Sequence, residues 1–116
     1  MNIARIWTDE KGETHYQDIE VALEPSGPLG RMSAPMPVTG MILRENEAGY
    51  DFDWHVAPRR QYIVMLSGLV EIQVSDGEKR IFGPGEIVLV EDLTGKGHKS
   101  RSPDGKPRKS IFLPLA

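Results

Sequence analysis

The sequence has no cysteine, no long apolar run and little net charge. Without cysteine among its 116 residues, neither a disulfide framework nor a thiolate metal site is possible, and we expect a cytoplasmic protein. No stretch approaches the roughly 20 apolar residues of a membrane-spanning helix, and the opening residues MNIARIWTDEKGE lack the apolar core of a signal peptide. A net charge of −3 argues against wholesale binding of a phosphate backbone. We therefore expect neither a membrane nor a nucleic acid as a partner.

Helical patterns, internal repeats, phosphate-binding loops and dinucleotide fingerprints are also absent, so we expect no nucleotide cofactor. Nine proline and 12 glycine residues instead favour many turns. Between the turns lie nine or ten short segments of strand character, at 3–7, 14–22, 41–44, 51–57, 61–66, 70–74, 79–82, 87–90, 98–102 and 110–115. This spacing predicts an all-β sandwich or barrel that forms one domain over residues 1–116.

Residues 24–40, EPSGPLGRMSAPMPVTG, interrupt this pattern. Their proline and glycine content predicts no regular element. The segment is nevertheless too apolar for a free linker, because it contains Leu29, Met32 and Met36. We expect an ordered arm that crosses the barrel surface or rims its mouth and covers core strands. The domain then divides into N-terminal strands and an arm at 1–40 and a barrel core at 41–116.

Two stretches, 49–68 and 85–98, carry the side chains best suited to chemistry. The first contains Asp53 and His55, which alternate onto one strand face, and then Arg59 and Arg60 at the bend that Pro58 makes. The second is an apolar strand followed by a glycine-rich turn that ends on a histidine. Two histidines presented from two turns predict a site inside a small barrel.

The two stretches resemble the two sequence motifs of the cupin superfamily. The first family motif, G-x5-H-x-H-x3,4-E-x6-G, has the spacing found here at Gly49, His55, Ala57, Gln61 and Gly68. The second, G-x5-P-x-G-x2-H-x3-N, is matched with two extra residues before its second glycine, at Gly85, Glu91, Gly95, His98 and Ser102. The resemblance covers roughly residues 40–102. It implies an all-β, single-domain double-stranded β-helix, the cupin jelly-roll barrel.

The resemblance also implies a thinned metal site. His55 and His98 match two of the family's three metal-binding histidines, whereas Ala57 replaces the third and Gln61 replaces the ligating glutamate. A set made of His55, Gln61 and His98 has no anionic ligand, which weakens binding of a divalent metal. Asp53 could supply the missing carboxylate and complete a site for Fe, Mn, Ni or Zn. The divalent transition metal is therefore expected to bind weakly or not at all.

An alternative keeps the pocket and needs no metal. Some cupins, such as sugar epimerases, carry out acid–base chemistry with histidine alone. Here His55 or His98 paired with Asp53 or Asp92 would form a proton-transfer dyad, which makes His55, His98 and Asp53 the candidate catalytic residues.

Four residues are candidates for substrate binding. Arg59 and Arg60 would hold a carboxylate or phosphate by paired hydrogen bonds. Met65 shares a strand face with Gln61, and Asp92 precedes the second histidine.

Three functions remain open at this point. The chain is a small-molecule enzyme (an isomerase, lyase or oxygenase), a non-catalytic module that binds or senses a small ligand, or a structural relic with both histidines in a polar core. We favour a small-molecule-binding cupin with a pocket around His55 and His98. We also expect a homodimer, because a small barrel must cover its outer strands and related cupins often do so by strand exchange.

Overall fold

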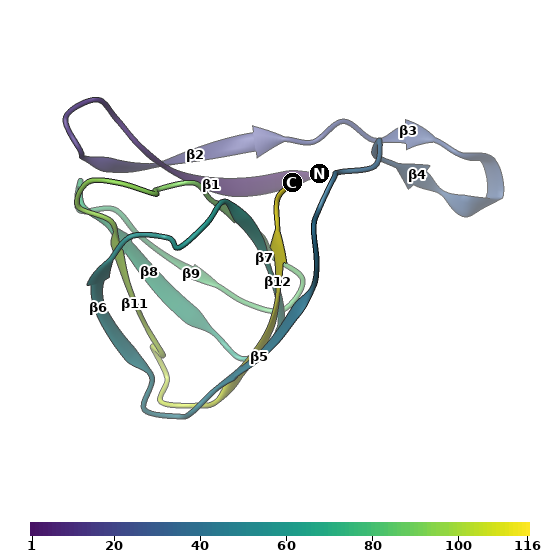
Figure 1. Cartoon of the computed structure of the whole chain (residues 1–116). Coiled ribbons are helices and arrows are strands. Elements are labelled where there is room, and N and C mark those ends of the chain that lie inside the picture. The colour runs from purple at the N-terminus through teal and green to yellow at the C-terminus, as the bar shows by residue number, and fades with distance from the viewer.

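The computed structural model describes residues 1–116 and consists of two main β-sheets that face each other (Figure 1). All ten expected strands are present, with end points that differ by no more than two residues. They are β1 (Asn2–Thr8), β2 (Thr14–Glu20), β5 (Ile42–Asn46), β6 (Asp51–His55), β7 (Gln61–Ser67), β8 (Val70–Val74), β9 (Lys79–Phe82), β10 (Ile87–Val90), β11 (His98–Arg101) and β12 (Arg108–Pro114). The all-β prediction is confirmed.

The first sheet has six strands in the order β2-β1-β10-β7-β12-β5, and the second has four in the order β6-β11-β8-β9. Strands β1 and β10 run parallel, whereas the other neighbours within these two sheets are antiparallel. Strands adjacent in space are often distant in sequence, as expected of a jelly roll. No helix of the structure is long and apolar enough to cross a membrane.

Period-two alternation explains how the strands make the core. On β8, Val70, Ile72 and Val74 are buried, while the intervening Glu71 and Gln73 are only half-buried. The inward side chains pack with apolar residues from the six-stranded sheet in one cluster. Each fully buried aliphatic side chain contributes roughly 1.5–3 kcal/mol relative to exposure, so this cluster holds the two sheets together.

The segment 24–40 differs from its prediction in two ways. It forms a small hairpin of its own, made of β3 (Glu24–Pro25), a 3-10 turn η1 (Gly27–Leu29) and β4 (Arg31–Met32). The hairpin projects away from the barrel instead of covering it (Figure 1). Leu29 is 76% exposed and Met32 is 50% exposed, so they cover no core strand in the isolated chain. The physical reason is that Gly27 and Gly30, both at positive φ, let the segment turn back and pair with itself.

Candidate functional site

A cavity of about 340 Å³ lies between the two sheets and is the candidate site. Its size falls at the lower end of the usual range for small-molecule pockets. Eleven of its 19 lining residues are hydrophobic, and no aspartate or glutamate is among them. The polar members are Arg44, Tyr50, His55, Arg59, Gln61, His98, Ser100 and Arg108. The lining is thus apolar with convergent basic and hydroxyl groups.

The cavity brings the two predicted histidines together. His55 ends β6 and His98 begins β11, the two residues are paired across the strands, and their ring centroids lie 4.4 Å apart. Gly97 permits this approach, because a Cβ there would lie 2.1 Å from the carbonyl oxygen of His55. The hydroxyl of the fully buried Thr14 donates a 2.6 Å hydrogen bond to the Gly97 carbonyl and fixes the turn.

His98 is oriented by a buried carboxylate. Its Nδ1 lies 2.6 Å from Oδ2 of Asp92, and Asp92 is fully buried. The other carboxylate oxygen of Asp92 has no hydrogen-bond partner. The Asp92 backbone carbonyl accepts a hydrogen bond from Ala57 N–H, which ties the loop after β10 to the end of β6. The predicted pairing of His98 with Asp92 is therefore present.

His55 has a different environment. Its Nδ1 lies 2.7 Å from the backbone carbonyl oxygen of Asp53, and its ring packs 4.0 Å from the ring of Phe52. Burial lowers the pKa of His55, and the neighbouring His98 lowers it further. Because a carbonyl oxygen can only accept, Nδ1 carries the hydrogen and the neutral ring leaves Nε2 as an acceptor.

Comparison with known proteins yields structural similarity only. No family model matches the chain, and no curated protein does. Protein NMB1881 from Neisseria meningitidis superposes with a TM-score of 0.52 at 20% identity, covering 66% of this chain and 72% of the other. A cupin 2 conserved barrel domain protein from Leptotrichia buccalis superposes with a TM-score of 0.50 at 19% identity over 88% of this chain. The chain has a cupin-type fold. It spans 44% of the length of the Leptotrichia chain.

In this cupin-type barrel, the motif positions meet at the cavity. Four motif residues line it although they come from separate parts of the sequence, namely β6, the loop after β6, β7 and β11: His55, Ala57, Gln61 and His98. The spacing of the motifs therefore located the right wall of the barrel.

The donor set does not fit a divalent metal. The structure contains no group of three or more histidine, cysteine, aspartate or glutamate side chains able to hold an ion. Gln61 lines the cavity, but its amide oxygen is neutral and receives a long 3.5 Å contact from Arg59 Nη1. Two imidazoles and an amide lack the charge that the bound ion would need.

The expectation that Asp53 shares a face with His55 is wrong. Between the pairs His98–His55 and Ser100–Phe52, β6 contains one residue more than β11, which is a β-bulge. The bulge shifts the alternation, so Phe52 and His55 line the cavity while the Asp53 side chain is exposed. Asp53 reaches His55 through its backbone carbonyl and offers the cavity no carboxylate.

Of the four substrate-binding candidates, two line the cavity and two do not. Arg59 and the buried Met65 line the cavity. Arg60 does not, because it forms an ion pair with Glu91, which also pairs with Arg5. Arg60 precedes β7, and its guanidinium contacts Glu91 outside the cavity. Asp92 contacts His98 from behind and does not line the cavity.

Four polar lining residues were not predicted from the sequence: Arg44, Tyr50, Ser100 and Arg108. Arg44 lies on β5 and Arg108 begins β12 two residues before the predicted strand start, and the two strands are antiparallel neighbours. The alternation of Arg108, Ser110 and Phe112, all buried, was the available signal. This alternation does not by itself predict a buried arginine, because arginine side chains are mostly exposed in proteins.

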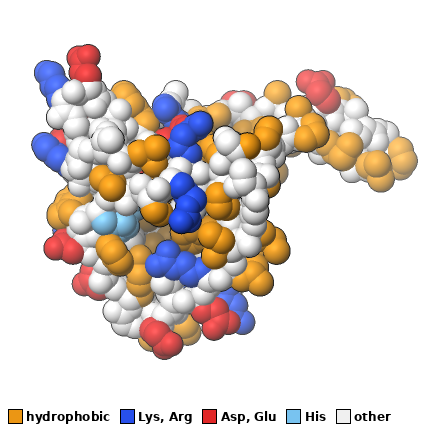
Figure 2. Space-filling model, viewed as in Figure 1, with side chains coloured by type: hydrophobic (Ala, Val, Ile, Leu, Met, Phe, Trp, Pro, Cys, Tyr) orange, Lys and Arg blue, Asp and Glu red, His pale blue; other side chains and the backbone are white.

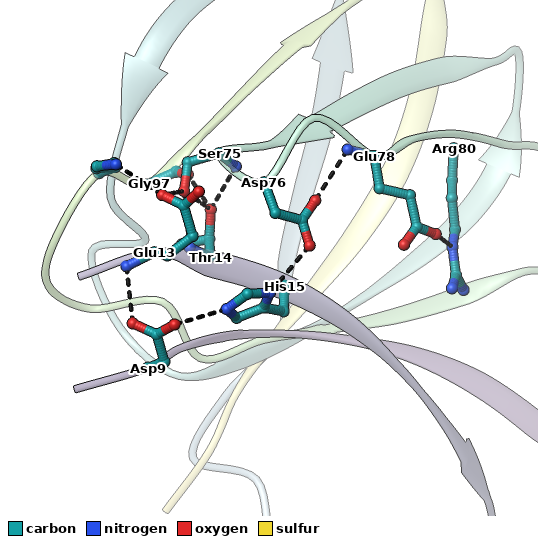
Figure 3. Close-up of polar contacts among 10 residues, drawn as sticks. Asp9, Glu13, Thr14, His15, Ser75, Asp76, Glu78, Arg80 and Gly97 are labelled. Carbon is teal, nitrogen blue, oxygen red and sulfur yellow. Dashed lines mark hydrogen bonds and ion pairs between the residues drawn. The ribbon is translucent and has the colours of Figure 1, made fainter. Parts of the chain in front are cut away.

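The third histidine, His15, lies outside the cavity. Figure 3 shows its ring between the carboxylates of Asp9 and Asp76, at 2.7 Å and 2.9 Å. These two hydrogen bonds, with Asp9 first, raise the pKa of His15. The residue thus joins the β1–β2 turn to the β8–β9 turn and has a structural role.

Proposed function

We propose that this chain is a small-molecule-binding protein whose cavity carries a proton-transfer pair, and that it acts as an isomerase or lyase without a metal ion. The main support is the 2.6 Å contact between Nδ1 of His98 and Oδ2 of the buried Asp92. The ring centroids of His55 and His98 lie 4.4 Å apart. Each imidazole has its Nδ1 held by another group, and neither Nε2 has a hydrogen-bond partner within the chain. Both rings line the cavity, so both Nε2 atoms are left for a ligand.

The two environments suit opposite roles. His55 has a lowered pKa and no carboxylate partner, so near neutral pH its Nε2 accepts a proton as a general base. Asp92 holds Nδ1 of His98 and fixes the ring with Nε2 directed into the cavity, so His98 takes the role of the general acid. A proton removed from one substrate atom and delivered to another completes an isomerisation or elimination with no oxidant or reductant.

Solvent deuterium incorporation tests this proposal. The protein is incubated in D₂O with small enolisable ketones and 2-oxo acids, and exchange at carbon is followed by NMR. We expect exchange that falls by about 100-fold or more in His55→Gln and in His98→Gln, the usual contribution of a general acid or base. His15→Gln is the matched control, since that histidine is also paired with carboxylates but lies outside the cavity.

Two results would contradict the proposal in different ways. Compounds that bind in the cavity and never exchange would favour the non-catalytic binding module. Stoichiometric Fe, Mn, Ni or Zn in the untagged protein, lost in His98→Ala, would refute the metal-free chemistry.

A homodimer is part of the same proposal. The projecting arm and the neighbouring edge strand β5 carry apolar side chains that are 40% or more exposed: Leu29, Met32, Met36, Val38, Met41, Ile42 and Leu43. A second copy packed against the arm and β5 would cover these exposed apolar side chains. Light scattering that shows a monomer at high concentration would exclude the dimer.

A further inference from the structure

Seven of the eight arginines fall into two groups by their ionic partners; the eighth, the exposed Arg31, donates to the backbone carbonyl of Leu23. Arg5, Arg60, Arg80 and Arg101 all pair with carboxylates at the surface. The three arginines that line the cavity, Arg44, Arg59 and Arg108, form no ion pair. This division is notable because aspartate and glutamate number 17 and outnumber the 14 lysines and arginines. The surface therefore has carboxylates to spare, yet none lines the cavity.

Arg108 is the strongest case. It is only 6% exposed, its Nη2 donates to Asn46 Oδ1 at 2.8 Å, and its buried Nε has no acceptor. Burial, and the nearby Arg44 to a smaller degree, lower the pKa of its guanidinium. A buried charge without a counter-ion destabilises a protein unless something else balances it. A bound anion would supply both the charge and the missing acceptor.

Arg44 strengthens the same wall. Its guanidinium carbon lies 5.7 Å from the Tyr50 ring centre, and that of Arg108 lies 4.9 Å from the same ring. Arg44 also stacks 5.1 Å from the Phe112 ring. Aromatic contacts hold the faces of both planar groups, so the N–H donors at their edges that have no acceptor, among them Nε of Arg108, can form hydrogen bonds with a ligand. Figure 2 shows Lys or Arg side chains gathered around the middle of this face, beside a histidine, with most acidic side chains nearer its outline.

We propose that the cavity binds a small apolar organic anion, a carboxylate or a phosphate monoester, whose charged end is held by Arg108 and Arg44 and whose apolar end lies against the hydrophobic lining. The inference rests on the proposed function and specifies its ligand class. The guanidinium fork recognises either anion by paired hydrogen bonds. Apolar side chains from both sheets, such as Phe52, Met65 and Val90, line the remainder of the cavity. The charged end then lies on the β5–β12 wall, and the two histidines face the ligand from the β6–β11 wall.

Three matched probes test the charge requirement: phenylacetate, phenyl phosphate and the neutral phenylacetamide. Binding is followed through the ring resonances of His55 and His98, with His15 as an internal reference. We expect at least one anion to bind at least tenfold more tightly than the amide. The anion that binds more tightly shows whether the natural ligand carries a carboxylate or a phosphate.

The variants Arg44→Gln and Arg108→Gln should each weaken anion binding at least tenfold. Arg101→Gln is the control, because Arg101 pairs with Glu71 outside the cavity. Arg108→Met distinguishes a ligand-binding arginine from one that stabilises the fold. We expect the melting temperature of this variant to be unchanged or raised, since an unpaired buried charge is removed. A clear drop in the melting temperature would mean that Arg108 stabilises the folded structure and would contradict its role in anion binding.

The outcomes separate this inference from the proposed function. Amide binding as tight as that of the anions, or full binding by Arg108→Gln, overturns the anion site while the cavity stays a binding site. If no probe, neutral or charged, shifts the resonances of His55 and His98, both proposals fail.

Discussion

Gly97→Ala should separate the two histidines and is the sharpest test of the site geometry. Gly97 has φ +72°, and a Cβ there would lie 2.1 Å from the carbonyl oxygen of His55 and 2.5 Å from its carbonyl carbon. Cβ atoms essentially never approach other atoms within 3.0 Å, so the oxygen would have to retreat by about 0.9 Å. Functional constellations tolerate about 0.5 Å, so the pairing of His55 with His98 is lost.

The loss of stability has two parts. Placing alanine in the left-handed region costs roughly 1–2 kcal/mol. Forcing two strand ends apart in a packed interior typically costs a further 1–3 kcal/mol. We therefore expect Gly97→Ala to lower the free energy of unfolding by about 2–5 kcal/mol, a large share of the typical 5–15 kcal/mol.

Gly105→Ala is the matched control. Gly105 has nearly the same φ, +69°, but a Cβ there meets nothing within 4 Å. Urea denaturation should show only the first part of the loss, roughly 1–2 kcal/mol. The ring resonances of His55 and His98 should move in Gly97→Ala and stay in place in Gly105→Ala. Equal losses of stability in the two variants, or unmoved resonances in Gly97→Ala, would refute the close approach.

Two further predictions concern histidine–carboxylate contacts, that of Asp92 with His98 and that of Asp9 with His15. Asp92→Asn weakens the hydrogen bond to His98 and buries an amide N–H without an acceptor, so urea denaturation should show a loss of about 1–3 kcal/mol in the free energy of unfolding. The control Asp53→Asn, at an exposed side chain, should show almost no loss. Equal losses in the two variants would contradict the pairing of Asp92 with His98. His15→Gln should destabilise the protein most between pH 3.8 and 6.5, because the lowered pKa of Asp9 keeps its carboxylate ionised above 3.8 and the raised pKa of His15 keeps the imidazole protonated up to and beyond 6.5. The stabilisation should fade as pH rises through the raised pKa of His15, and as pH falls through the lowered pKa of Asp9. A stability difference between wild type and His15→Gln that does not change with pH would refute this link.

The positions of the candidate histidines were accessible from the sequence, and the identities of their partners only in part. Motif spacing indicated that His55 and His98 would meet, since His55 ends a strand before the bend at Pro58 and His98 begins a strand after a glycine-rich turn. Asp92 was one of two proposed carboxylates, and only the buried loop after β10 selects it. Asp53 was excluded by a bulge, which belongs to the pairing of β6 with β11 and not to either strand alone.

The sequence by itself determined the all-β class and the places of ten strands. Those features follow from local signals: apolar residues that alternate with period two, and glycine or proline where the backbone must turn. Only the tertiary structure decided that the hairpin of residues 24–40 projects and that Arg44 and Arg108 share a wall. The physical reason is that burial, charge balance and strand register arise between segments that are distant in sequence. Arg108 became a candidate ligand-binding residue when the fold enclosed its charge and placed no carboxylate beside it.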